Sequence, residues 1–295
     1  RSLPQEEEAP HTAGTAEERL LAFIGGKAES ALLMDAFNIL LEEDIFRTNP
    51  QALEKLNGWV KARDASRQPA AMYAMGILLL EKDDLSGAVK MAEEGLSKYP
   101  QSLPVQILSL NTITVLLDKN RLQDAERLIS KYPGSSPDLV FQQGALAFLK
   151  KDYSLAQKFF REAARRASET TAENALFNEN LAALNANDAS GAAALIKEAS
   201  GSSRLRESIL FEQAHYAAKR MAPQAAELLA NFITLAETPA LKTQARLDQV
   251  EVALNLNPPD LETVQAILPL LEKEQLSPEQ TMQLARLNIL EAESR

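Results

Sequence analysis

The chain of 295 residues contains no cysteine, and this absence excludes disulfide bonds, thiolate metal sites and cysteine nucleophiles. Histidine is almost as scarce, since only His11 and His215 occur, so paired-histidine metal sites are excluded and acid–base catalysis by histidine is not expected. We expect His215 to be packed within a helix. The motifs of the nucleophile elbow, the P-loop and the glycine-rich dinucleotide loop are also missing. The chain is therefore predicted not to be an enzyme and to carry no catalytic residue, cofactor or metal ion.

An excess of positive charge is missing as well. The 31 Lys and Arg residues are outnumbered by 41 Asp and Glu, which gives a formal net charge of −10 and a pI near 5.0. Because no stripe of basic residues occurs, neither nucleic acid nor an anionic membrane is expected as a partner. The apolar stretch at 103–117 is too short and too rich in Gln, Ser, Asn and Thr to span a bilayer.

Aromatic residues make up only 5% of the chain, and strand-forming patterns are nearly absent. Proline falls mostly at the boundaries of segments that have helical periodicity. With so few large side chains, the helices must pack through small residues, above all alanine. This composition indicates an all-α protein.

The sequence does contain an internal repeat. Gly76 and Gly144 are separated by the same interval as Ala88 and Ala156, and this interval is two periods of about 34 residues. Each copy has the pattern of a helix, a polar turn and a second helix. A glycine inside a helix costs about 1 kcal/mol relative to alanine, so we expect these glycines to lie where two helices approach closely.

The alanine position recurs five times along the chain, at intervals that scatter around the same period. These alanines are Ala88, Ala125, Ala156, Ala192 and Ala225. The intervals predict five repeats, over residues 69–102, 106–136, 137–170, 173–205 and 206–238. In the turns at 82–84, 151–152 and 187–188, Asp is expected to cap the second helix of the repeat.

The spacing and the small residues resemble the tetratricopeptide repeat family. The resemblance is strongest in 69–102, where Gly76 is at the eighth position, Ala88 at the twentieth and Pro100 at the thirty-second, and in 137–170. It implies a right-handed α–α superhelix of antiparallel helix pairs. It also implies that the first helices line a concave side on which partner segments commonly bind. No particular member of the family is indicated.

The segment before the repeats divides into two parts. Residues 1–14 have the composition of a flexible tether, and residues 15–68 are expected to form N-terminal helices with a divergent repeat. Thr15 and Glu18 predict a capping box for a short first helix. A longer helix is expected from Lys27 to about Phe46, and the pair Asn49-Pro50 is expected to begin its partner helix.

Residues 239–295 are expected to form a helix pair and one final helix. The pair spans 239–256 and 260–274, with Asp260 as the cap of its second helix. The final helix opens at 277–279, and it is either a terminal cap or the first helix of a further repeat.

Two sets of side chains are expected to face a groove formed by the first helices. The apolar set either grips a partner or packs neighbouring first helices together, and consists of Tyr73, Leu110, Phe141, Phe177 and Leu210. The amide set either pairs with the backbone of an extended peptide or is ordinary polar surface, and consists of Asn111, Gln142, Asn174 and Asn178. The predicted partner-binding groove comprises Tyr73, Asn111, Phe141, Gln142, Asn174, Phe177 and Asn178.

These features favour a non-catalytic scaffold that binds a protein or peptide partner on its concave face, in a bacterial secretion, polysaccharide-export or surface-assembly system. The absence of cysteine favours a location in the periplasm or envelope, because stray thiols mispair in an oxidising compartment; the cytoplasm is the alternative. A signal sequence or membrane anchor upstream of residue 1 fits the tether, and self-association through the terminal helices stays open. Two other functions also stay open: a cytosolic peptide-sensing regulator, and the repeat region of an enzyme whose catalytic domain lies outside this chain.

Overall fold

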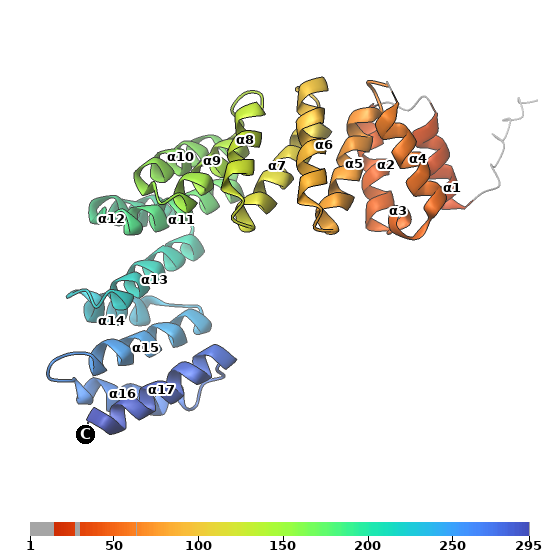
Figure 1. Ribbon diagram of the computed structural model, residues 1–295. Coiled ribbons are helices and arrows are strands. Elements are labelled where there is room, and N and C mark those ends of the chain that lie inside the picture. The colour runs from red at the N-terminus through yellow and green to blue at the C-terminus, as the bar shows by residue number, and fades with distance from the viewer. Residues whose placement is uncertain (1–14, 27–29, 63, 295) are drawn as a thin grey trace, which may run out of the picture. The chain divides into compact units, whose positions relative to one another are not determined.

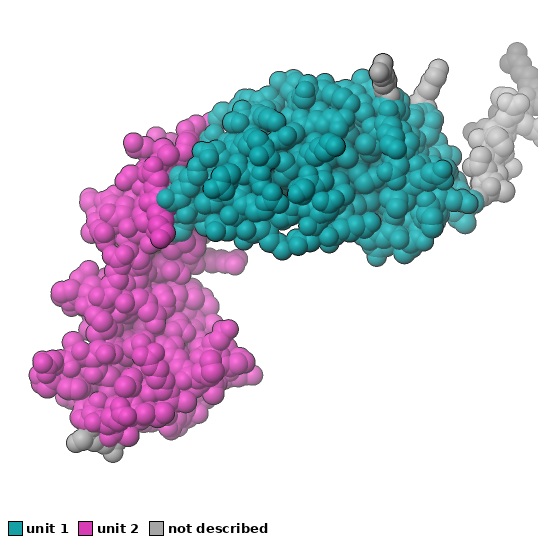
Figure 2. Space-filling model, in the orientation of Figure 1, with its two compact units in different colours: residues 1–150 teal, residues 151–295 magenta. Residues whose placement is uncertain are grey.

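The structure, a computed structural model, describes residues 15–26, 30–62 and 64–294 (Figure 1). Within these ranges the chain forms seventeen α-helices, one short 3-10 helix and no strand. The predicted all-α class and the helical-repeat architecture are therefore confirmed. The predicted tether, 1–14, and the predicted start of the second helix at Lys27 lie outside the described residues. The chain divides into two compact units, residues 1–150 and residues 151–295 (Figure 2).

Unit 1, residues 1–150, is a stack of helix pairs in which each helix packs against its neighbours in sequence. Helix α5 packs against α4, α6 and α7, helix α7 packs against α8 and α9, and the second helices α6 and α8 also contact each other. The helices are α1 (Ala16–Gly25), α2 (Ser30–Glu42), α3 (Ile45–Thr48), α4 (Pro50–Lys61), α5 (Gln68–Glu81), α6 (Leu85–Lys98), α7 (Leu103–Asp118), α8 (Leu122–Lys131) and α9 (Pro137–Leu149).

Unit 2, residues 151–295, repeats this arrangement. Helix α11 packs against α10, α12 and α13, helix α13 packs against α14 and α15, and helix α15 packs against α16 and α17. The helices are α10 (Tyr153–Arg166), α11 (Glu169–Asn185), α12 (Ala189–Glu198), α13 (Ser203–Lys219), α14 (Ala225–Leu235), α15 (Pro239–Leu254), α16 (Leu261–Leu271) and α17 (Pro278–Ser294), with a 3-10 helix, η1, at Ala199–Gly201.

A residue with positive φ marks the turn between the two helices of each predicted repeat. These residues are Asp83, Asn120, Lys151, Asn187 and Met221, with φ between 51° and 64°. Each precedes the recurring alanine of its repeat by four or five positions, and all five alanines are at most 3% exposed. The left-handed conformation reverses the chain within a few residues, and the alanine then lets the second helix lie close to the core.

Aspartate follows several of these left-handed residues and caps the next helix, as the sequence predicts. Asp84 accepts a hydrogen bond from the backbone N–H of Gly87, and Asp152 and Asp188 cap α10 and α12 in the same way. Asp260 caps α16 through the N–H of Thr263. Each such cap satisfies one N–H of the first helical turn, which otherwise has no partner within its helix.

The expectation of one helix from Lys27 to Phe46 is wrong. Helix α2 ends at Glu42, Asp44 adopts a left-handed conformation with φ 58°, and the short helix α3 begins at Ile45. This break turns Phe46 into the core, where its ring lies 6.1 Å from that of Phe37. The gain from burying a second phenylalanine there explains why helical periodicity does not continue through the break.

Gly76 lies in α5 at the point where α7 crosses it. A Cβ atom at this position would lie 2.3 Å and 2.7 Å from the two methyl carbons of Leu108, a fully buried residue of α7. The close approach of two helices therefore requires glycine at this position, as predicted from the repeat.

We expect Gly76→Ala to lower the free energy of unfolding by about 1–3 kcal/mol, because the added methyl group displaces a leucine that is fully buried. Gly58→Ala is the matched control: Gly58 lies within α4, is exposed and has open space at its Cβ, so the substitution should raise stability by about 0.5–1 kcal/mol. Urea denaturation followed by circular dichroism measures both. A Gly76→Ala protein as stable as the wild type would show that this contact does not need glycine.

Candidate interaction surfaces

The apolar set of the predicted groove mainly joins neighbouring helices. Tyr73 is half-buried and packs against two hydrophobic clusters of unit 1, and Leu110 packs within the second of them. Burial raises the pKa of the Tyr73 phenol, with a smaller contribution from Glu42. In unit 2, Phe177 packs against the cluster that includes Leu195. These contacts favour the packing interpretation for these three residues, while Phe141 is half-buried on α9.

The amide set is only partly free. Asn111 is exposed on α7 and has no hydrogen-bond partner among the described residues. Gln142 of α9 donates a hydrogen bond of 2.8 Å to the hydroxyl of Thr114, so it links two first helices. In unit 2, Asn178 donates to the carbonyl oxygen of Asn174 on its own helix. Within unit 1, Asn111 and Gln142 lie on adjacent first helices, and of the two only Asn111 keeps its amide unpaired.

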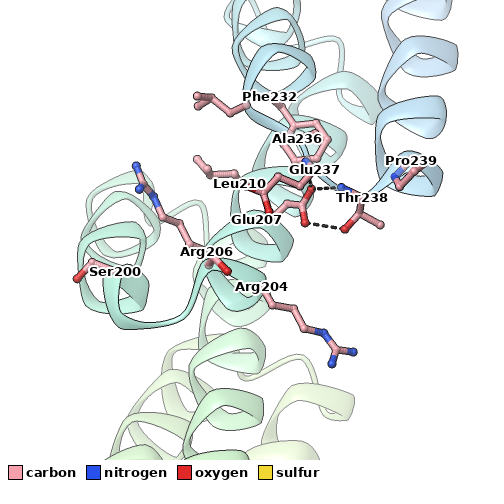
Figure 3. Close-up of a pocket in the computed structure, with 12 residues that line it drawn as sticks. Ser200, Arg204, Arg206, Glu207, Leu210, Phe232, Ala236, Glu237, Thr238 and Pro239 are labelled. Atoms are coloured by element: carbon pink, nitrogen blue, oxygen red, sulfur yellow. Dashed lines mark hydrogen bonds between the residues drawn. The ribbon is translucent and has the colours of Figure 1, made fainter.

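A second surface, which the sequence did not predict, lies in unit 2. A cavity of about 570 Å³ opens at the N-terminal end of α13 (Figure 3). Its lining includes Arg204, Arg206, Leu210, Phe232 and Leu235. One wall comes from α13 and the other from the end of α14 and the turn that follows it.

Glu207 of α13 also lines this cavity. Its carboxylate accepts hydrogen bonds of 2.7 Å from the backbone N–H groups of Glu237 and Thr238 and from the hydroxyl of Thr238 (Figure 3). Burial opposes ionisation of Glu207, but the hydrogen bonds from Thr238 and Glu237 outweigh it and lower the pKa of this carboxyl. Glu207 therefore fixes the turn into α15 and has little capacity left for a ligand.

Two further cavities continue from the first along α13. One, of about 400 Å³, shares Leu210, Phe232 and Leu235 with the first cavity. The next, of about 320 Å³, shares Gln213 and Leu228 with the second. We call the three cavities together the α13 groove: residues of α13 and α14 line all three, and α12 contributes to the second and the third.

Gln213 lines both the second and the third cavity. It lies at the eighth position of its repeat, where Gly76 permits close helix contact in unit 1. Its amide instead donates to the side-chain oxygen of Asn180, at 2.9 Å, and to the carbonyl oxygen of Ala192, at 2.8 Å. The Gln213 amide therefore ties α13 to both helices of the preceding repeat, α11 and α12.

His215 is half-buried in α13, as expected, but it is not merely packed. Its Nδ1 lies 2.5 Å from a carboxylate oxygen of Asp248 on α15, whose side chain is fully buried. Lys219 lies 3.8 Å from the other oxygen of Asp248 and 3.2 Å from Glu251. The bond to Asp248 raises the pKa of His215 despite the opposing effect of burial. Burial and Asp248 together raise the pKa of neighbouring Glu212.

Little in the sequence could have revealed these residues. His215 and Asp248 lie about one repeat period apart, and a histidine one period from an aspartate was the available signal. The α13 groove left a similar signal in Gln213, which replaces the glycine of the stronger repeats. Neither the spacing of His215 and Asp248 nor the glutamine at the eighth position shows which residues will be in contact.

Neither a metal-ion cluster nor a membrane-spanning helix is found in the described ranges. No cluster of three or more His, Asp or Glu side chains placed to hold a metal ion occurs among the described residues. None of the described helices combines the length and the apolar character needed to cross a bilayer.

Comparison of the chain with protein-family models and with curated protein sequences gave no match. The resemblance to the tetratricopeptide repeat therefore rests on the spacing and the residues that carry it, namely the recurring alanines and the glycines Gly76 and Gly144.

The His215–Asp248 pair predicts a pH dependence of stability. Because folding raises the pKa of His215, the folded chain holds this proton more tightly than the unfolded chain does. The stabilisation is complete below about pH 6.5, the ordinary value for histidine, and is lost as the pH rises through the higher value of the folded state. Relative to His215→Gln, the wild type should be more stable by about 1.5–3 kcal/mol near pH 5.5, which is the range for a hydrogen bond to a charged group.

Urea denaturation of both proteins between about pH 5.5 and about pH 9, a range that brackets the ordinary pKa of histidine, measures this difference. His11 is common to both proteins and cancels in the comparison. A difference that is constant across this range would show that the proton on His215 does not contribute to folding.

Proposed function

We propose that the protein is a non-catalytic interaction scaffold that binds a partner polypeptide along its first helices. The observation that carries this proposal is the surface of α7 and α9 in unit 1. Asn111 is exposed and unpaired there, among the described residues, and it lies on the same helix as the half-exposed side chains of Ile107 and Leu110. Phe141 and Gln142 of α9 extend this surface. A free amide beside apolar side chains can bind a peptide backbone and its side chains together.

The repeat architecture supports the same proposal. Within each unit, a stack of helix pairs exposes a row of first helices, and such rows provide extended binding surfaces in repeat proteins. The chain further resembles the tetratricopeptide repeat in the residues described above, and a right-handed superhelix with the partner on its concave side is part of the proposal.

The proposed setting is a secretion, polysaccharide-export or surface-assembly system of a bacterial envelope. The absence of cysteine from all 295 residues supports it, since an oxidising compartment penalises stray thiols. Fractionation of the source cells tests the setting separately from the binding surface.

Site-specific photo-crosslinking tests the binding surface. A photoreactive amino acid at position 111 should capture a partner polypeptide in source cells, whereas the same amino acid at Gln123 should not. Gln123 is the matched control because it is also an exposed amide, on the second helix α8. Equal capture at the two positions would contradict the assignment of the first-helix surface.

Asn111→Ala should weaken binding of the captured partner about threefold to tenfold, since a single hydrogen bond contributes about 0.5–1.5 kcal/mol. Isothermal titration with the purified partner measures the change, and Gln123→Ala should leave the affinity unaltered. A partner that binds Asn111→Ala as tightly as the wild type would show that the amide takes no part.

A further inference from the structure

Helix α17 has apolar residues on two opposite faces. On the inner face, Leu284 and Leu287 belong to a buried cluster with residues of α15 and α16. The outer face carries four exposed residues, which we call the α17 stripe: Pro278, Met282, Ala285 and Ile289. Their spacing of four, three and four positions keeps them on one side of the helix, as in the seam of a coiled coil.

The corresponding face of the neighbouring first helix, α15, is covered. Both helices begin with a proline, and when these prolines are aligned Met282 corresponds to Thr243 and Ile289 to Val250. Thr243 is 7% exposed and Val250 is fully buried, because α16 and α17 pack against α15. In α17, the last described helix (Figure 1), Met282 is instead 72% exposed and Ile289 61% exposed. The α17 stripe is therefore a surface of the kind that another helix covers within this stack.

One edge of the α17 stripe carries charges that alternate in sign. Glu279, Arg286 and Glu293 follow one another at intervals of seven residues, so they lie along the same edge, and none of them has an ion-pair or hydrogen-bond partner among the described residues. When two helices pair antiparallel about a two-fold axis, this edge of one helix faces the same edge of the other. A row that reads negative, positive, negative then matches a second copy of itself, because Arg286 of one copy meets a glutamate of the other.

We propose that two copies of this chain associate through their α17 stripes, as an antiparallel helix pair. The size of the side chains selects the register: Met282 of each copy packs on Ala285 of the other, and in the same way Ile289 packs on Pro278. Each large side chain then meets a smaller residue. The overlap extends about 17 Å along the helix. This surface is independent of the α7–α9 surface of the proposed function, which lies in unit 1.

The same register pairs the charges. Arg286 of each copy lies beside Glu279 of the other, and the two-fold axis makes this contact twice. Two other registers fit less well. Placing Met282 opposite Ile289 would bring the two copies of Arg286 together, and pairing Arg286 with Glu293 would leave Met282 outside the overlap. A single helix pair of this length is a small interface, so the dimer is expected to be weak and to depend on concentration.

Sedimentation equilibrium of the full chain, between about 1 μM and about 1 mM, tests the association over the range of weak complexes. The average mass should rise with concentration from the 32.4 kDa of one chain toward twice that value. Met282→Asp should abolish this rise, because it places a carboxylate in the centre of the apolar contact. Circular dichroism should show that the variant folds as the wild type does, since Met282 is exposed in the single chain.

Charge reversal tests the register. Glu279→Arg and Arg286→Glu should each weaken the dimer about tenfold, because like charges then face each other twice. An equimolar mixture of these two variants should dimerise as well as the wild type, since every position 279 then meets a position 286 of opposite charge. Glu293→Arg is the matched control: it reverses a charge on the same edge of α17 but outside the overlap, so the dimer should keep its affinity.

A chain that stays monomeric at every concentration would overturn the proposal, as would a dimer that Met282→Asp leaves intact. The antiparallel register is overturned if the mixture of Glu279→Arg and Arg286→Glu dimerises no better than either variant alone. It is overturned equally if Glu293→Arg weakens the dimer as much as Glu279→Arg does. Asn111→Ala should not change the dimer, so failure of this proposal and failure of the proposed function are separate results.

Discussion

The tight reversal between the two helices of each repeat is the constraint on which the stack depends. A residue in the left-handed conformation recurs at Asp83, Asn120, Lys151, Asn187 and Met221. It directs the chain back along its own path, so that an alanine reaches the core a few residues later, and in three of the five turns an aspartate caps the next helix. Because neither helix can bury its apolar side alone, each hairpin must then pack on the next. Turn, cap and small residue act together, and the repeat period follows from their fixed order.

Polar bonds between consecutive repeats follow the same period. Many of them join residues separated by 33 or 34 positions: Arg47 with Glu81, Glu93 with Arg127, Asn180 with Gln213, Asn187 with Arg220, and His215 with Asp248. Each pair connects nearly equivalent places in neighbouring hairpins. Apolar packing alone would allow one hairpin to slide over the next, whereas these directional bonds hold a single alignment.

The sequence was sufficient for the regular part of the fold and insufficient for its irregular part. The alanine spacing and the capping aspartates placed α6 and α10 closely, because short-range rules determine where such helices begin. The break at Asp44 was missed because a long-range contact, Phe46 with Phe37, overrides local periodicity. The expected groove residues were a surface assignment by analogy, and the structure uses Tyr73 and Gln142 partly to join helices. The α13 groove was not foreseen, since Gln213 reveals only that glycine is missing and not which residues its amide bonds.

The one-period bonds have a consequence for how such a chain can change in evolution. Inserting a single residue within a helix rotates every later side chain of that helix by about 100°, so that an insertion in α13 before Gln213 would turn its amide away from Asn180. Copying a whole hairpin, in contrast, returns every donor to an equivalent acceptor. A gene for this protein can therefore gain or lose whole hairpins of about 34 codons, while insertions of a few residues are confined to the turns, as the unequal intervals between the recurring alanines show.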